Sequence, residues 1–451
     1  MTTAQELSGV RGARHSLALT ELHASLSDPV LDSMTFLNEV TARFPDAISF
    51  APGRPNEGLF DPDSISGYLR AYTSYLERDC GYTPQQVCTA IFQYGRTKGQ
   101  IHELIARTLG NDEGMLVPPD AVVVTVGAQE GMLLVLRALF AGPSDVLLAS
   151  SPCYIGITGV ARLLDIEVMP VPELDSGPDT GAVAEAARRV RAAGKRPRAF
   201  YVVPDFANPS GASMTTEARA RLLEVAIAED LLIVEDNPYG FFTRESAPRP
   251  TLKSLDRDRS VIYLGSFAKT CFPGARLGYV IADQEVIVPD GSRRLLADEL
   301  AKIKSMTTVN TPSLSQAVIG GILISRGCRL REANTAAIRL YSANMQVMLA
   351  ELTRRFPADQ RGSHGLSWNI PDGGFFVVVK VPFVADESAL QRSGREYGVL
   401  WTPMNSFYLD GGGTHQLRLS CSYVTPDQIT EGIGRLAAFV TAQSAAAAGA
   451  V

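Results

Sequence analysis

The stretch Ser260-Val-Ile-Tyr-Leu-Gly-Ser-Phe-Ala-Lys-Thr-Cys-Phe-Pro-Gly-Ala-Arg-Leu-Gly278 joins an apolar segment to a loop that carries a hydroxyl, an amine and a guanidinium. Its first part, Ser260–Gly265, is short and almost continuously apolar, which is typical of a strand buried on both faces. Lys269 follows this strand, three residues after Ser266 and seven residues before Arg276. We therefore expect an amine beside two anion-binding groups at the carboxyl end of a buried strand.

Upstream of this stretch, short apolar runs alternate with segments of helical periodicity. The predicted strands cover residues 121–126, 145–149, 167–171, 199–203, 231–235 and 260–265. The predicted helices between them cover residues 128–140, 157–164, 181–193 and 216–229. This alternation predicts an α/β fold in which helices cover both faces of a mostly parallel sheet. Ligands bind such sheets at the carboxyl ends of the strands.

The pattern changes after about residue 315. One long helix is predicted over Ser315–Arg355, followed by strands at 374–381 and 416–420 and by a last helix over 426–442. These elements indicate a smaller α+β unit. We predict three parts. A large domain covers 61–315 and a small C-terminal domain covers 316–451, while residues 1–60 form an N-terminal arm and part of the small domain.

Composition and charge narrow the class of protein. The chain has 451 residues and a formal charge of −6, and the absence of a basic run argues against a nucleic-acid partner. No apolar stretch is long enough to span a bilayer, and the N-terminus lacks the apolar region of a secretory signal. Six cysteines and five histidines are scattered without metal-ligand spacing. We expect a cytoplasmic protein that binds neither membrane nor metal.

Polar residues at other strand ends suggest a cofactor. A lysine at a strand end beside phosphate-binding groups favours a Schiff-base lysine that holds pyridoxal phosphate. Asp236 ends the strand at 231–235, where its charge could keep the pyridine nitrogen protonated, and a protonated ring stabilises a carbanion at the substrate α-carbon. Tyr239 could donate to the ring hydroxyl. A plain strand-ending turn explains Asp236-Asn-Pro-Tyr239 equally well.

Four further segments allow both a functional and a structural interpretation. Asn208-Pro-Ser-Gly211 could present an amide to the ring hydroxyl, but it is also a strong turn signal. Gly127-Ala128-Gln129 opens a helix whose backbone N–H groups could bind a phosphate, or forms a simple turn. Tyr154 could stack on the ring or fill the core. Arg418 lies in an apolar strand, where it either faces outward or binds an anion such as a substrate carboxylate.

Together these segments resemble the fold-type I, class I and II pyridoxal-phosphate aminotransferases. The matching segments are Tyr94-Gly95…Gly99, Gly127-Ala-Gln129, Pro152-Cys-Tyr154, Asn208-Pro-Ser-Gly211, Asp236-Asn-Pro-Tyr239, Ser266-Phe-Ala-Lys269, Arg276-Leu-Gly278, Gly373-Gly-Phe375 and Arg418. Three more segments, Leu22–Asp28, Phe92–Gly99 and Ala301–Met306, are similar to the dihydroxyphenylglycine transaminase group of specialised metabolism. The resemblance implies amino transfer between an amino acid, aromatic or of the arylglycine type, and a 2-oxo acid.

The resemblance also implies a role for each residue around the ring. Lys269 would form the Schiff base and move the substrate proton. Asp236 would pair with the ring nitrogen, and Asn208 and Tyr239 would hold the ring oxygen. Tyr154 would stack on the ring face.

For the phosphate, the resemblance implies Ser266, Arg276 and the backbone at Gly127, Ala128 and Gln129. Ala128 departs from the family pattern, because many relatives carry a hydroxyl residue there. One phosphate hydrogen bond would therefore come from the backbone alone.

Arg418, with Gly53 and Asn208 near it, would bind the substrate carboxylate. Tyr94 in such enzymes reaches the phosphate of the neighbouring subunit's cofactor, which implies a homodimer with two shared active sites.

Other functions remain open at the level of sequence. The same cofactor and carbanion would serve β- or γ-elimination, replacement or carbon–carbon bond formation on an amino acid such as S-adenosylmethionine. A transcription regulator built on this fold would need an added winged-helix domain, for which the first fifty residues are too short. The side-chain pocket of the substrate is not defined by the sequence, although Arg54, Asn310, Tyr408 and His415 are candidates for it.

Overall fold

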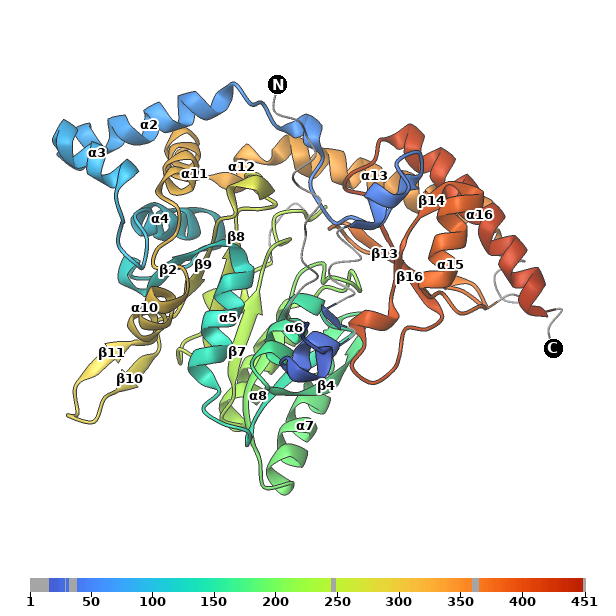
Figure 1. Ribbon diagram of the computed structural model, residues 1–451, viewed down its shortest axis with the longest axis horizontal. Helices are drawn as coiled ribbons and strands as arrows, with labels where there is room; N and C mark the ends of the chain where they lie inside the picture. The colour runs from blue at the N-terminus through green and yellow to red at the C-terminus, as the bar shows by residue number, and fades with distance from the viewer. Residues whose placement is uncertain (1–15, 29, 32–38, 245–248, 359–364, 449–451) are drawn as a thin grey trace, which may run out of the picture.

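The computed structural model describes residues 16–28, 30–31, 39–244, 249–358 and 365–448 (Figure 1). Its largest feature is an eight-stranded sheet in the order β2-β9-β8-β7-β6-β3-β4-β5. The strands are β2 (Val122–Thr125), β3 (Asp145–Ser151), β4 (Glu167–Leu174), β5 (Gly177–Pro178), β6 (Arg196–Val202), β7 (Leu232–Asp236), β8 (Val261–Ser266) and β9 (Gly278–Ile281). Strands β4, β3, β6, β7 and β8 pair in parallel, whereas β5 and β9 run antiparallel to their neighbours. The predicted mostly parallel α/β sheet is confirmed.

The strands are apolar throughout because both faces of the sheet are buried. Val123, Leu147 and Tyr201 belong to a core that includes residues of the helices α5, α6 and α10. Val146 and Phe200, each next to one of these residues, belong to the core on the opposite face under α7 and α8. Side chains alternate between faces along a strand, so an almost continuous apolar run is what a doubly covered sheet requires.

The helices predicted over 128–140, 157–164, 181–193 and 216–229 are confirmed, and further helices surround the sheet. They are α2 (Ser64–Arg78), α3 (Pro84–Phe92), α4 (His102–Glu113), α5 (Gly127–Leu139), α6 (Ile155–Leu163), α7 (Thr180–Ala192), α8 (Thr216–Ala228), α9 (Leu252–Leu255) and α10 (Leu296–Thr307). Side chains cap the starts of α7 and α8: Asp179 accepts from the backbone of α7, and Thr215 accepts from the N–H of Ala218 in α8. A hairpin of β10 (Glu285–Ile287) and β11 (Arg293–Leu295) projects from the body in Figure 1.

The prediction of one long helix over Ser315–Arg355 was wrong. The structure has three helices there, α11 (Ser313–Ser325), α12 (Leu330–Ala333) and α13 (Thr335–Arg355). Gly327 and Cys328 adopt φ values of 59° and 55°, and the N–H of Cys328 returns to the carbonyl of Leu323 at 2.7 Å. Left-handed backbone of this kind ends a helix, and the apolar periodicity on either side does not reveal it.

A second, four-stranded sheet forms the core of the other unit, at the right of Figure 1. It is antiparallel in the order β12 (Ser367–Trp368), β13 (Phe376–Lys380), β16 (Gln416–Ser420) and β15 (Thr402–Pro403). The helices of this unit are α13, α15 (Glu387–Arg392) and α16 (Pro426–Ala448). The early strand β1 (Ile48–Ser49) pairs in parallel with β14 (Val399–Leu400), so the N-terminal segment joins this unit. The domain boundaries at 60 and 315 stay a prediction.

None of the helices within the described ranges combines the length and apolar character needed to cross a membrane.

A buried ion pair fixes the first turn of α5 against α10. The Nζ of Lys304 lies 2.8 and 3.1 Å from the two carboxylate oxygens of Glu130, and the Thr308 hydroxyl donates to the same carboxylate at 2.6 Å. The N–H of Val126 also donates to Glu130, at 2.6 Å. Burial lowers the pKa of Lys304, although Glu130 opposes this effect. The start of α5 is therefore held by a charge that is fully hydrogen-bonded.

Replacing Lys304 by Met should destabilise the protein by about 3–5 kcal/mol, because the Glu130 carboxylate would be left buried without its cation. Lys302→Met is the matched control on the same helix, where the exposed pair with Glu299 contributes about 0–1 kcal/mol. Chemical denaturation of both variants measures the difference. Equal losses in the two variants would contradict the assigned role of the buried pair.

Candidate active site

The predicted site residues lie at the carboxyl ends of neighbouring strands. Tyr154 follows β3, Asn208 follows β6, Asp236 ends β7 and Lys269 follows β8. Strands β3, β6, β7 and β8 are adjacent and parallel, so these four segments meet at one edge of the sheet.

The Lys269 side chain is half-buried, and two guanidinium groups lie near its amine. Its Nζ donates a hydrogen bond of 2.7 Å to the carbonyl of Gly53. Burial, with smaller contributions from Arg418 and Arg276, lowers the pKa of Lys269 to about 8. An amine with this pKa is half uncharged near pH 8, so far more of it is in the nucleophilic neutral form than of an ordinary lysine.

Asp236 has one carboxylate oxygen bound and the other free. The Tyr201 hydroxyl donates to Oδ2 at 2.6 Å, whereas Oδ1 is buried and has no hydrogen-bond partner within the described part of the chain. The side chain is only 3% exposed, and burial raises its pKa to about 6 against the opposing hydrogen bond from Tyr201. An unpaired buried carboxylate oxygen needs an external donor, and a protonated pyridine nitrogen is a donor of the right kind.

A cradle for an anion forms where β2, β9 and β8 lie side by side. Gly127 opens α5 with φ +72°, and a Cβ built on it would lie 2.8 Å from Nη2 of Arg276. On β9, Gly278 pairs with Ser266 at the end of β8, and a Cβ on Gly278 would lie 2.7 Å from the N atom of Ala128. A guanidinium, a hydroxyl and a helix N-terminus thus converge, which is the combination that binds a phosphate.

The side chain of Gln129 has a different role from its backbone. Its Nε2 donates to the carbonyl of Gly156 at 2.9 Å, which ties α5 to the start of α6. A Cβ on Gly156 would lie 2.2 Å from the Tyr154 ring, so this glycine leaves room for the ring to pack against α6. Burial raises the pKa of Tyr154 to about 12, and the phenol stays neutral beside Asp236.

Arg418 is a buried cation without an acidic partner. It is 4% exposed, and its Nη atoms donate to Oδ1 of Asn208, to the carbonyl of Ala51 at 2.8 Å and to the hydroxyl of Thr402 at 3.2 Å. Its Nε is buried without a partner, and no carboxylate pairs with it in the described ranges. Burial lowers the pKa of Arg418 to about 10. A planar cation in this state has the geometry and charge to bind a carboxylate.

Gly53 lies between the two cationic groups. Its carbonyl accepts from Lys269, and the neighbouring Ala51 carbonyl accepts from Arg418. A Cβ on Gly53 would lie 2.6 Å from Cζ of Phe376, and the same phenyl ring lies 4.4 Å from Cζ of Arg418. The absence of a side chain at position 53 therefore lets Phe376 pack under the guanidinium.

The hydroxyl of Tyr239 completes the group, through a hydrogen bond with Asn208. Its ring makes edge contacts with Phe375 and Phe376, at centroid distances of 5.3 and 5.6 Å. Thus the structure brings together all the predicted site residues except Tyr94.

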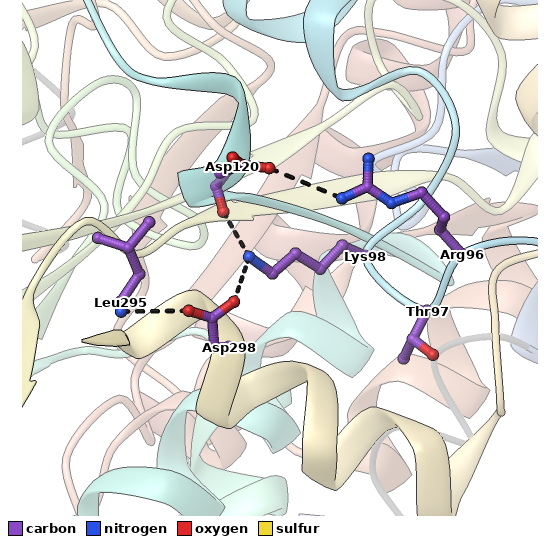
Figure 2. A pocket seen from close by; sticks show the side chains of 6 residues that line it. All are labelled: Arg96, Thr97, Lys98, Asp120, Leu295 and Asp298. Atoms are coloured by element: carbon purple, nitrogen blue, oxygen red, sulfur yellow. Dashed lines mark hydrogen bonds and ion pairs between the residues drawn. The ribbon is translucent and has the colours of Figure 1, made fainter. Parts of the chain in front are cut away.

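Tyr94 lies apart from this group, on an outer loop, and is 84% exposed. Figure 2 shows the pocket of about 450 Å³ beside that loop, where Lys98 reaches Asp298 at 2.5 Å and the carbonyl of Asp120 at 2.7 Å. Arg96 pairs with the Asp120 carboxylate at 3.6 Å. Because these charges already neutralise one another, we interpret the pocket as an anchor for the loop.

The four candidate side-chain residues are held in different ways. The Arg54 guanidinium lies 3.9 Å from the Tyr423 ring centroid, beside Gly53. The other three make local contacts, listed as Tyr408 with Gln416 at 2.8 Å, His415 with the Phe383 carbonyl at 2.9 Å and Asn310 with the Thr311 carbonyl at 3.4 Å. Within the described ranges, no three or more of the His, Cys, Asp and Glu side chains are grouped as a metal site.

Tyr201 was missed by the sequence reasoning. It lies inside a predicted apolar strand, where an aromatic residue is ordinarily part of the core. The available signal was a hydroxyl in a strand that is otherwise apolar, next to the strand that ends in Asp236.

Comparison with known proteins places this geometry in context. The model of the family "Aminotransferase class I and II" matches residues 82–436. The (S)-3,5-dihydroxyphenylglycine transaminase of Amycolatopsis orientalis is 49% identical over 432 residues, which cover 96% of each chain. The 2-aminoadipate transaminase of Thermus thermophilus is 30% identical over 87% of this chain and 89% of its own. The Pyrococcus horikoshii kynurenine aminotransferase, solved with PMP, superposes with a TM-score of 0.77 at 28% identity, covering 95% of this chain and 97% of its own.

Gly53→Ala should weaken carboxylate binding about tenfold, because the new methyl group would displace Phe376 from beneath Arg418. Gly67→Ala is the control, since a Cβ there meets nothing within 4 Å. Inhibition constants of a simple carboxylate measured on both variants test this expectation. Unchanged inhibition by the carboxylate in Gly53→Ala would show that Phe376 does not position Arg418.

Proposed function

Because the chain belongs to the class I and II aminotransferases, with pyridoxal phosphate as its cofactor, we propose that it transfers the amino group of an arylglycine or aromatic amino acid to a 2-oxo acid. The proposal assigns this reaction to specialised metabolism. The observation that carries it is the 49% identity to a dihydroxyphenylglycine transaminase along nearly the whole chain.

The residues at the sheet edge fit the cofactor. Asp236, with its unpaired Oδ1, would hold the ring nitrogen, and Asn208 and Tyr239 would hold the ring oxygen. Tyr154 would cover the ring face. When bound, pyridoxal phosphate supplies an electron sink that stabilises a carbanion at the substrate α-carbon.

The cradle at the start of α5 would hold the phosphate. Ser266 and Arg276 would donate from their side chains, and Ala128 and Gln129 from their backbone N–H groups. The buried Glu130 supports this assignment, because it accepts from Val126 and so fixes the turn that aims the helix N-terminus.

Lys269 would both carry the cofactor and move the substrate proton. With a pKa of about 8, its Nζ can accept a proton near neutral pH and return it in a later step. The Gly53 carbonyl, 2.7 Å away, would orient the amine during both steps.

Arg418 would bind the α-carboxylate of both substrates, since it is buried and pairs with no acid of the described chain. The Phe407 ring, which is buried, lies 5.3 Å from its Cζ and helps to hold the guanidinium in place.

The relatives named above are all transaminases or aminotransferases, which favours amino transfer over the elimination or replacement alternative.

The proposed enzyme is a homodimer in which each subunit completes the partner's site. Three apolar side chains, Phe92, Tyr94 and Met306, are unusually exposed, at 75%, 84% and 84%. Ser313 at the start of α11 contacts the carbonyl of Gln93, which joins this loop to the 306–314 segment. A second copy of the chain would cover both.

Incubation with (S)-3,5-dihydroxyphenylglycine and a panel of 2-oxo acids should yield the corresponding aryl 2-oxo acid and a new amino acid in equal amounts. Turnover should exceed that of alanine or aspartate by about tenfold or more, which corresponds to roughly 1.4 kcal/mol of transition-state binding. Chromatography of both products measures it. Release of the amino acid's side chain without a matching amino acid product would contradict the proposal.

Co-expression of Lys269→Ala with Tyr94→Ala should restore activity, because one site of the mixed dimer would contain both native residues. Random pairing would give about a quarter of the wild-type activity per site. Each variant expressed alone serves as the control. If Tyr94 served its own subunit, co-expression would yield only the average of the two parent activities.

A further inference from the structure

Tyr201 holds one oxygen of the proposed ring-nitrogen acid. Its side chain lies on β6 and is 1% exposed. The hydroxyl donates a hydrogen bond of 2.6 Å to Oδ2 of Asp236, which ends the neighbouring strand β7. A buried phenol is unfavourable unless its hydroxyl is hydrogen-bonded, so this contact accounts for a tyrosine in an otherwise apolar strand. Because Oδ2 is occupied, the carboxylate has Oδ1 left for another donor.

Among the described groups around the Asp236 carboxylate, Tyr201 is the one that donates a hydrogen bond to it. Cys153 and Tyr154, from the segment after β3, and Tyr239, from the segment after β7, also face Asp236. Burial raises the pKa of each, to about 12 for Tyr154 and further for the others, so all three are neutral in the ordinary pH range. The pKa of Asp236 is raised by burial and lowered by Tyr201.

We propose that Tyr201 is a positioning residue for the reaction, which holds the Asp236 carboxylate by Oδ2 and leaves Oδ1 for the pyridine nitrogen. This inference rests on the proposed role of Asp236. The hydroxyl prevents the carboxylate from turning, and it stabilises the ionised form that a protonated ring requires.

The sign of the pH effect follows from the direction of the hydrogen bond. Donation from Tyr201 favours ionised Asp236, so loss of the hydroxyl raises the pKa of this carboxyl. Asp236 would then become protonated at a higher pH and lose its attraction for the ring cation. Without the Tyr201 hydroxyl, the protein is therefore expected to lose its cofactor at a higher pH than the wild type does.

The test is equilibrium dialysis of the holoenzyme between pH 5 and pH 9, with the retained cofactor measured by its visible absorbance. On the acid side, the fraction of cofactor retained falls as the pH is lowered, and we call this fall the acid limb. In Tyr201→Phe, which keeps the aromatic ring, the midpoint of the acid limb should move upward by about one pH unit. Tyr72→Phe, an equally buried phenol on α2 and outside the site, should leave the limb in place. An unchanged limb in Tyr201→Phe would overturn the inference.

The variant Asp236→Asn distinguishes a failure of the Tyr201 role from a failure of the Asp236 role on which it rests. If Asp236→Asn retains the cofactor with the wild-type pH dependence, the proposed role of Asp236 fails. If Asp236→Asn abolishes the acid limb but Tyr201→Phe does not move it, only the role of Tyr201 fails.

The double variant tests whether Tyr201 acts through Asp236. Adding Tyr201→Phe to Asp236→Asn should change cofactor retention no further. An additional loss in the double variant would show that Tyr201 is a packing residue and would overturn the inference.

Discussion

Enclosure of Lys269 and Asp236 at the edge of the large sheet, and of Arg418 on β16 of the second sheet, is the constraint on which the site depends. Each is an ionisable group removed from water without an opposite charge beside it, and burial shifts its pKa toward the neutral form, to about 8, 6 and 10. Such groups cost stability in the folded chain. They are compatible with the fold because two apolar layers hold the strands rigidly, and because backbone carbonyls and the Tyr201 hydroxyl supply partial compensation.

The same constraint accounts for the long-range contacts of the site. Carbonyls of the segment 51–53, early in the chain, accept from Arg418 and Lys269, which belong to two different sheets. The segment can approach both because Gly53 has no side chain and Phe376 fills the space. The Lys269 amine and the Arg418 guanidinium thereby share one stretch of backbone, so the proposed carboxylate position and the proposed Schiff-base lysine are fixed relative to each other.

Sequence alone predicted what depends on local pattern. Apolar runs indicated the strands, and Asp236 and Lys269 could be placed at strand ends, where parallel strands bring them together. The break of the predicted helix at Gly327 depends on backbone geometry, which periodicity does not report. The contact of Tyr201 with Asp236 depends on which strand lies next to β7, and the position of Tyr94 has meaning only beside a second chain.

The lysine that carries the cofactor can be identified directly. Borohydride reduction of the holoenzyme, followed by proteolysis and mass spectrometry, attaches the phosphopyridoxyl group permanently to the lysine that holds it. We expect this mass on the peptide that contains Lys269 and Thr270, with the other lysines unmodified. The same mass on another lysine, such as the buried Lys304, would contradict this expectation.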